Sequence, residues 1–370
     1  MKLTGTFAIY ADVAALNCNK TEQADIGQIS LVKKVGNRPY ASGQAWRHWW
    51  RNVLYNHFGW NPTTYEMVKA EGAGAHGYAA CDPVEHEDDD LFGYMRAEKG
   101  NNAIKRTSPL HCSALSAIHD ARPVSDFGVL SVAGDNAVFQ REVYSAWMAA
   151  NFSLDLERVG VFEAPLVEGR AGGELDAETL RNHANKLVQV THDKFALSRD
   201  ERKRRVRDLL KALTLLEGGA NLARNNTDVT PQVLVLTAVE HGNAILQGIF
   251  KKRDDSIIID IERLKYLRDR NLLEELHISA VPGVVINEQA VKQLEFVRWH
   301  STMEELVTAV ANLVDKFYDD LQQEERAVDA ESLRQSIEAA AAAKKAKGRK
   351  QGKEQNEQQE LADQREIDEE

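Results

Sequence analysis

Residues 42–58 have the sequence SGQAWRHWWRNVLYNHF, which predicts an amphipathic helix. Ser42 suits the N-cap position because its hydroxyl can accept a hydrogen bond from a free backbone N–H of the first turn. Apolar residues recur at helical spacing along one side, namely Trp46, Trp49, Trp50, Val53 and Leu54. Gln44, Arg47, His48 and Arg51 share the other side. We therefore expect the tryptophans to pack mainly in a core, although one exposed tryptophan could stack on a nucleobase.

Strand patterns lie on both sides of this helix in the sequence. Residues 3–15 alternate loosely and predict a strand, and residues 127–161 predict mostly strand, with clear alternation over 150–162. Between them, residues 60–110 are rich in glycine and contain the acidic run Glu85–Asp90, as expected of an insertion. We expect this acidic run to be a solvated surface segment.

The second half of the chain alternates between helical and strand patterns. Residues 173–216 are predicted to be helical and to end at Gly218-Gly219, a helix C-terminal signal. The segments QVLVLTAVE and NAILQGIF are predicted to be two strands joined by a tight hairpin at His241-Gly242-Asn243. Residues 287–325 again have a helical pattern.

The order of these elements predicts an α+β fold, and it is compatible with a ferredoxin-like core that carries large insertions. We expect one elaborated domain over residues 1–325, with an insertion at about 60–110 and a helical insertion at about 173–216. Residues 326–370 have few large apolar side chains and many charges, which predicts a low-complexity tail. No internal repeat of fixed period is visible.

Composition narrows the class of protein. The chain has 370 residues, of which 43% are hydrophobic, so a substantial core is expected. Its net charge of -11 argues at first against a nucleic-acid partner. No signal-peptide pattern or long apolar run occurs, and the three cysteines, Cys18, Cys81 and Cys112, are widely spaced. We therefore expect reduced thiols and a cytoplasmic protein.

Signatures of catalysis are weak. The sequence contains neither a G-x-S-x-G motif nor a Walker phosphate loop, and its histidines and cysteines do not have the spacing of a zinc site. The Glu85–Asp90 run lacks the spaced ligands of a calcium loop, although its carboxylates could hold a divalent cation. We expect no enzyme activity, no cofactor and no bound metal.

Local charge favours nucleic-acid binding more than the total does. Residues 17–51 contain six Lys or Arg against two acids, and residues 199–211 contain seven against three. The latter cluster could equally be a solvated helix face. A polyanion requires a local positive potential rather than a positive total. The helix that begins after Ser42, with Gly43 in its first turn, would also direct backbone N–H groups toward a phosphate.

Five segments, which follow one another in the order found in that family, resemble the DevR-type CRISPR-associated autoregulator family. They are ALNCNKTEQADIGQ, YASGQAWRHWWR, DDDLFGYM with KRTSPL close behind, NFSLDLERVGVF, and LLEGGANLARN before TPQVLVLTAV. Members of this family are the backbone, or Cas-seven, subunits of type I Cascade surveillance complexes, and the chain is most similar to subtype I-B. The resemblance implies a modified RNA-recognition-motif palm with finger and thumb insertions.

The resemblance also implies a function and a set of partners. Several copies would polymerise along a CRISPR RNA and present its spacer for pairing with a target DNA strand, beside other Cascade subunits and away from membranes. Together with the basic path, it gives these expected RNA-binding residues: Lys20, Gln28, Lys33, Lys34, Arg38, Ser42, Gly43, Gln44, Arg47, His48, Arg51, Lys105, Arg106, Gly218, Gly219, Asn221 and Arg224.

Two other functions remain open at this point. Related type III subunits cut target RNA with an acidic residue in an early loop, where this chain has Asp25, which we expect to be non-catalytic. The first alternative is thus a metal-dependent ribonuclease that acts through Asp25 or the Glu85–Asp90 carboxylates. The second is an interaction protein whose charged helices bind only protein partners.

Overall fold

The computed structural model describes residues 1–23, 28–68, 76–79, 81–97, 103–132, 135–164, 173–175, 177–322 and 325–329, and four isolated positions up to 339. Its centre is a mixed sheet with the strand order β17-β1-β13-β11. These strands are β1 (Lys2–Ala14), β11 (Leu115–Ala117), β13 (Asp135–Asp155) and β17 (Val233–Val239), and each neighbouring pair is antiparallel. Short β10 (Leu110–Cys112) also pairs with β13, beside β11.

Helices α1 (Gly43–Phe58) and α4 (Arg199–Leu213) complete the ferredoxin-like pattern. Along the chain the core elements follow as β1, α1, β10 with β11, β13, α4 and β17, which is the split β-α-β order. The expected α+β palm is therefore confirmed. Strands β5 (Arg38–Ala41) and β4 (Lys34–Val35) extend the sheet at one edge, and β20 (Leu276–Ala280) and β21 (Val297–Trp299) extend it at the other.

Both faces of this sheet are covered. On one face α1, α4 and α7 (Met303–Asp319) form the main hydrophobic cluster with the sheet. On the other face a C-terminal unit forms a second cluster with Ala8, Trp147, Val233 and Val235. This unit contains β18 (Phe250–Arg253), β19 (Ser256–Ile259), α5 (Ile261–Asp269) and α6 (Glu288–Lys292). Because β1 lies between the two clusters, its residues 3–9 are all buried rather than alternating.

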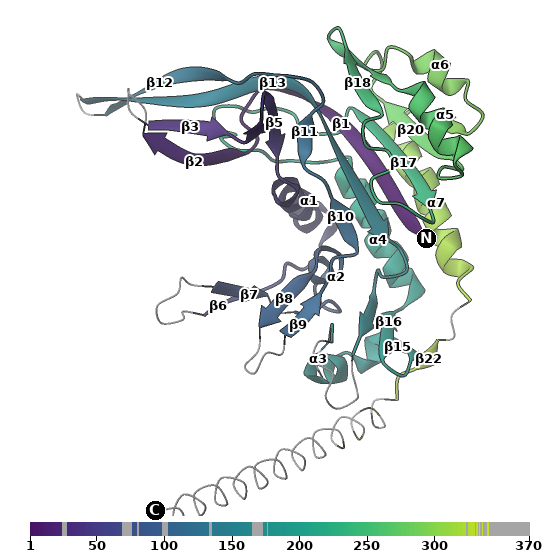
Figure 1. The fold of residues 1–370 in the computed structure, drawn as a ribbon. Coiled ribbons are helices and arrows are strands. Elements are labelled where there is room, and N and C mark those ends of the chain that lie inside the picture. Colours follow the sequence, from purple (N-terminus) through teal and green to yellow (C-terminus); the bar gives the residue numbers. More distant parts are fainter. Residues whose placement is uncertain are drawn as a thin grey trace, which may run out of the picture.

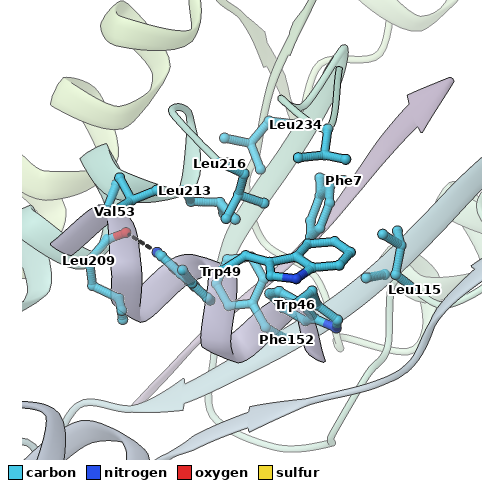
Figure 2. Packing of buried hydrophobic residues seen from close by; sticks show 14 of the residues in the cluster. Phe7, Trp46, Trp49, Val53, Leu115, Phe152, Leu209, Leu213, Leu216 and Leu234 are labelled. Atoms are coloured by element: carbon cyan, nitrogen blue, oxygen red, sulfur yellow. Dashed lines mark hydrogen bonds between the residues drawn. The ribbon is translucent and has the colours of Figure 1, made fainter. Parts of the chain in front are cut away.

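The tryptophans of α1 lie in the main cluster, as expected (Figure 2). The rings of Trp46 and Trp50 stack with centroids 5.5 Å apart, and Phe7 of β1 meets Trp46 edge-on at 5.4 Å. Trp49 is only 6% exposed. No tryptophan of α1 is therefore free to stack on a base in the described conformation.

Three extensions project from this core (Figure 1). The first is an arm made of β2 (Cys18–Gln23), β3 (Gln28–Val32), β12 (Val124–Val132) and the first half of β13. The second contains β6 (Tyr65–Val68), β7 (His76–Ala79), α2 (Glu87–Phe92), β8 (Tyr94–Ala97) and β9 (Ala103–Arg106). The third contains β14 (Val161–Glu163), α3 (Ala177–Asn182), β15 (Leu187–Thr191), β16 (Lys194–Leu197) and β22 (Arg326–Ala327).

Three predictions about elements are wrong in detail. The predicted helical stretch 173–216 contains the strands β15 and β16 before α4 begins, and the stretch 287–325 contains β21 between α6 and α7. No hairpin forms at residues 241–243, because β17 pairs with β1 and β20, and the next strand, β18, pairs with β19. The tail beyond residue 339 lies outside the described residues.

Candidate nucleic-acid interface

The first turn of α1 lies against the end of β10. Ser42 is its N-cap, and the Ser42 hydroxyl accepts a hydrogen bond from the backbone N–H of Ala45. A Cβ atom on Gly43 would lie 3.1 Å from the carbonyl oxygen of Cys112 and 3.2 Å from that of Ser113. Glycine at this position therefore allows the helix to start this close to the strand.

A groove of about 570 Å³ opens beside this turn. Its walls come from α1, from the end of α2 and from the segment that leads into β10. The lining residues are Gly43, Gln44, Arg47, Arg51, Phe92, Ser108 and Cys112. In Figure 1, α1 lies between the β12–β13 arm and the extension that contains β6–β9, on the side of the sheet away from α5 and α6.

The guanidinium of Arg47 already forms hydrogen bonds within the protein. Its guanidinium donates hydrogen bonds to the carbonyl oxygens of Leu110 and Phe92, both at 2.8 Å, and to the Ser108 hydroxyl at 3.1 Å. Burial lowers the pKa of Arg47 below its usual value, and neighbouring Arg51 lowers it further. These bonds join α1 to the end of α2 and to β10.

Arg51 lies one turn further along α1, and its guanidinium makes fewer polar contacts than that of Arg47. Among the described residues its guanidinium forms no hydrogen bond or ion pair, and its buried Nε has no partner. The guanidinium carbon of Arg51 lies 5.4 Å from the centre of the Phe92 ring. The pKa of His48 is lowered first by partial desolvation of its ring and then by the positive charge of Arg51. The groove therefore holds guanidinium charge that no carboxylate of the described residues contacts as an ion pair.

Three basic residues precede α1. Exposed Lys34 forms an ion pair with Glu142 of β13 at 2.6 Å, and exposed Arg38 forms one with Asp120 at 3.2 Å. Lys33 is half-buried, and its backbone N–H donates to the carbonyl oxygen of Asn17. The structure thus brings Lys33, Lys34 and Arg38 to one edge of the sheet, next to the start of α1.

The glycine segment after α4 contacts both α1 and the arm. Gly218 lies on the Trp49 indole, where a Cβ atom would come within 2.1 Å of the ring. Gly219 has a φ of +126°, which strongly favours glycine. Asn221 donates a hydrogen bond from its Nδ2 to Cys18 Sγ at 3.7 Å, and exposed Arg224 lies over the Phe139 ring at 4.6 Å.

The remaining residues expected to contact RNA differ in their exposure. The side chains of Lys20 and Gln28 lie outside the described residues, as does Asp25 entirely. Lys105 on β9 is exposed. Arg106 is not available for RNA in this conformation, which corrects the expectation, because its fully buried guanidinium forms ion pairs with Asp90 and Glu174.

The acidic run is not a solvated segment, which is a second correction. Residues Glu87–Asp90 begin α2, and all four are buried, whereas Glu85 before them is exposed. Asp90 pairs with Arg205 of α4 at 2.8 Å as well as with Arg106, and Glu87 pairs with Arg204 at 2.7 Å. Glu87 and Asp90 therefore attach α2 to α4, while Asp88 accepts a hydrogen bond from the Tyr55 hydroxyl of α1.

Part of the basic cluster on α4 is also buried inside the protein. Arg202, Lys203 and Arg205 are all buried, and Lys203 forms an ion pair with Asp319 at the end of α7. These three residues therefore form neither a solvated helix face nor a nucleic-acid-binding face. Asp89 has its pKa raised to about 6, first by burial and then by the neighbouring Asp88 charge.

Sequence reasoning missed three residues that line the groove, Phe92, Ser108 and Cys112. Phe92 and Ser108 occur in motifs that carried the family resemblance, DDDLFGYM and KRTSPL. Their chemistry gave no signal of its own, because an isolated phenylalanine and serine are common core and loop residues. In the described part of the chain, no group of three or more His, Cys, Asp or Glu side chains is arranged to hold a metal ion.

None of the described helices is long and apolar enough to cross a membrane. The model of the family described as CRISPR-associated negative auto-regulator DevR/Csa2 matches residues 6–252. No curated protein matches the chain.

Two solved structures match the chain over most of its length. A chain titled "CRISPR RNA-guided surveillance complex, pre-nicking" has a TM-score of 0.51 and 10% identity, and the match covers 85% of this chain and 100% of that one. A chain titled "CRISPR RNA-guided surveillance complex" has a TM-score of 0.49 and 9% identity, over 85% and 99%. At such low identity, the first of these matches shows a shared fold.

Proposed function

The chain belongs to the CRISPR-associated DevR/Csa2 family, and from this premise we propose that it is an RNA-binding backbone subunit of a surveillance complex. In this proposal several copies polymerise along a CRISPR RNA and present its spacer for pairing with a target DNA strand. Each copy binds the sugar-phosphate backbone, so the affinity is independent of base sequence. The work is binding and display rather than bond cleavage.

The observation that carries the proposal is the groove beside the first turns of α1. Gly43 and Gln44 line it at the positive end of the helix dipole, and Arg51 adds a guanidinium charge without an ion-pair partner among the described residues. These features suit a phosphate group. The opposite face of the sheet, which a single RNA-recognition motif would present to RNA, is covered by the C-terminal unit.

Further contacts in this proposal extend from the groove in two directions. Along the edge of the sheet, the proposed RNA contacts are Lys33, Lys34 and Arg38. On the strands of the arm they are Lys20 and Gln28. The glycine segment after α4 adds proposed RNA contacts from Asn221 and Arg224, which lie against Cys18 and Phe139 of the arm. Lys105 adds a contact from the second extension.

No observation favours the ribonuclease alternative. The carboxylates of Glu87–Asp90 are buried, and three of the four accept hydrogen bonds from backbone N–H groups or from arginines that attach α2 to its neighbours. A metal-dependent nuclease needs carboxylates that can reach both a metal ion and a phosphate. We therefore propose a non-catalytic subunit.

The substitution Gln44→Glu tests the position of the groove. Exposed Gln44 lies in the first turn of α1, where a carboxylate stabilises the helix dipole, so the fold is expected to be retained. The same carboxylate would repel a phosphate. We expect the affinity for a fluorescein-labelled oligouridine RNA, measured by anisotropy, to fall about tenfold at low salt.

The matched control is Gln289→Glu, which makes the same charge change at an exposed position in α6, in the unit on the opposite face of the sheet. This control is expected to bind like the unaltered protein. Equal losses in the two variants would show that only total charge matters, and no loss in either would remove the groove from the proposal.

A further inference from the structure

One aromatic ring contacts both arginines of the groove. Phe92 is the last residue of α2, and its side chain is 7% exposed. The guanidinium carbon of Arg47 lies 5.2 Å from the centre of the Phe92 ring, and that of Arg51 lies 5.4 Å from it. Both distances are within the range of an attractive cation–π contact.

The backbone around Phe92 is tightly held. The next residue, Gly93, has a φ of +77°, and a Cβ atom there would lie 2.6 Å from the carbonyl oxygen of Arg106. On the preceding side, the Ser108 hydroxyl donates to the carbonyl oxygen of Leu91 at 2.7 Å. The backbone on both sides of Phe92 is thus held by protein contacts, and the ring itself is buried.

The two arginines use this ring differently. Arg47 donates to three protein oxygens, so its guanidinium is already positioned by hydrogen bonds. Arg51 has no such bonds among the described residues. The ring of Phe92 lies against its guanidinium at the groove, and the Asp88 carboxylate is close enough to attract the same charge. A long side chain that is ordered before binding loses less conformational entropy when it binds.

From this geometry we infer that Phe92 is a positioning residue for RNA binding: its ring holds the guanidinium of Arg51 ready for a phosphate, while Arg47 attaches α1 to α2 and β10. The inference rests on the proposed function and refines it, because the two arginines of the groove acquire separate roles. Phe92 itself makes no contact with the RNA in this account.

A double-mutant cycle tests the inference. Phe92→Leu keeps an apolar side chain but removes the face of the ring, and Phe92→Tyr keeps the ring. We expect Phe92→Leu to weaken binding of the labelled oligouridine about fivefold, and Phe92→Tyr to bind nearly as well as the unaltered protein. Arg51→Ala should weaken binding about tenfold and reduce the magnitude of the salt slope by about 0.7 for each phosphate that is no longer neutralised.

The decisive comparison is between the two backgrounds. If Phe92 acts through Arg51, then Phe92→Leu costs no further affinity in a chain that already carries Arg51→Ala. A role in folding alone would instead give the same loss in both backgrounds, and that result would overturn the inference. A Phe92→Leu variant that binds as tightly as the unaltered protein would also overturn it.

The matched control is Tyr266→Leu on α5. This substitution removes the ring beneath Arg270, whose guanidinium carbon lies 5.8 Å from the ring centre. This control is expected to leave RNA affinity unchanged. Failure of the unaltered protein to bind RNA would contradict the proposed function itself. RNA binding that is unaffected by Phe92→Leu would contradict only the role of Phe92.

Discussion

At the scale of single residues, Asp89 gives the molecule a measurable dependence on pH. Its carboxylate accepts hydrogen bonds from the Thr63 hydroxyl and from the backbone N–H of Asp82, yet burial and Asp88 raise its pKa from 3.8 to about 6. The folded protein therefore binds more protons than the unfolded chain between these two values. The contribution of Asp89 to the free energy of unfolding falls as the pH rises through this interval, by at most about 3 kcal/mol.

Asp89→Asn removes this titration but keeps an oxygen that can accept the same hydrogen bonds. We expect the variant to gain stability relative to the unaltered protein as the pH rises from 3.8 to about 6, in thermal unfolding followed by circular dichroism. Other carboxylates titrate in the same interval, so the quantity to compare is the difference between the two proteins. Parallel pH profiles would show that Asp89 has an ordinary pKa.

At the scale of elements, the attachment of α2 to α4 is electrostatic and buried. Asp90 is fully buried and contacts Arg106, Arg205 and the backbone N–H of Gly160. We expect Arg205→Met to lower the free energy of unfolding by about 3–5 kcal/mol, because it leaves a buried carboxylate with one cation fewer. Chemical denaturation measures this loss directly.

Arg207 on the same helix provides the control. It pairs with Asp315 of α7, but its side chain is 42% exposed. Arg207→Met is therefore expected to cost less than about 1 kcal/mol. If the two variants were equally stable, the buried network would not be what holds α2 in place.

The same elements show what sequence could and could not predict. The N-cap at Ser42, the buried tryptophans and the α+β order depend on local patterns, and they are confirmed. The burial of Glu87–Asp90 depends on arginines more than 100 residues away, such as Arg205, and no local pattern contains that information. The hairpin predicted at residues 241–243 was wrong for a similar reason, because the C-terminal unit intervenes between β17 and its partner β20.

The candidate site was partly predictable for the same physical reasons. Gly43, Gln44, Arg47 and Arg51 lie on one helix, so their spacing alone brings them to one groove. Phe92 reaches that groove only through the long-range attachment of α2, and Arg106 is withdrawn from solvent by it. Residue type and local charge do not distinguish a buried arginine from an exposed one.

At the scale of the whole molecule, the net charge of -11 no longer opposes an RNA partner. The acidic side chains of Glu87–Asp90 are buried, and two of them, Glu87 and Asp90, pair with arginines of α4. Around the groove, in contrast, the guanidinium of Arg51 has no ion-pair partner among the described residues. A local positive potential on an acidic protein restricts a polyanion to one path, because other surfaces repel it.

The central claim is that copies of the chain assemble along an RNA backbone. Mass photometry of the purified protein with oligouridines of increasing length tests it most directly. Assembly of this kind predicts RNA-bound species whose mass rises in steps of one chain, 41.4 kDa plus RNA, as the RNA lengthens, and which dissociate as salt increases. A particle mass that stays at that of the protein alone, at every RNA length and at low salt, would contradict it.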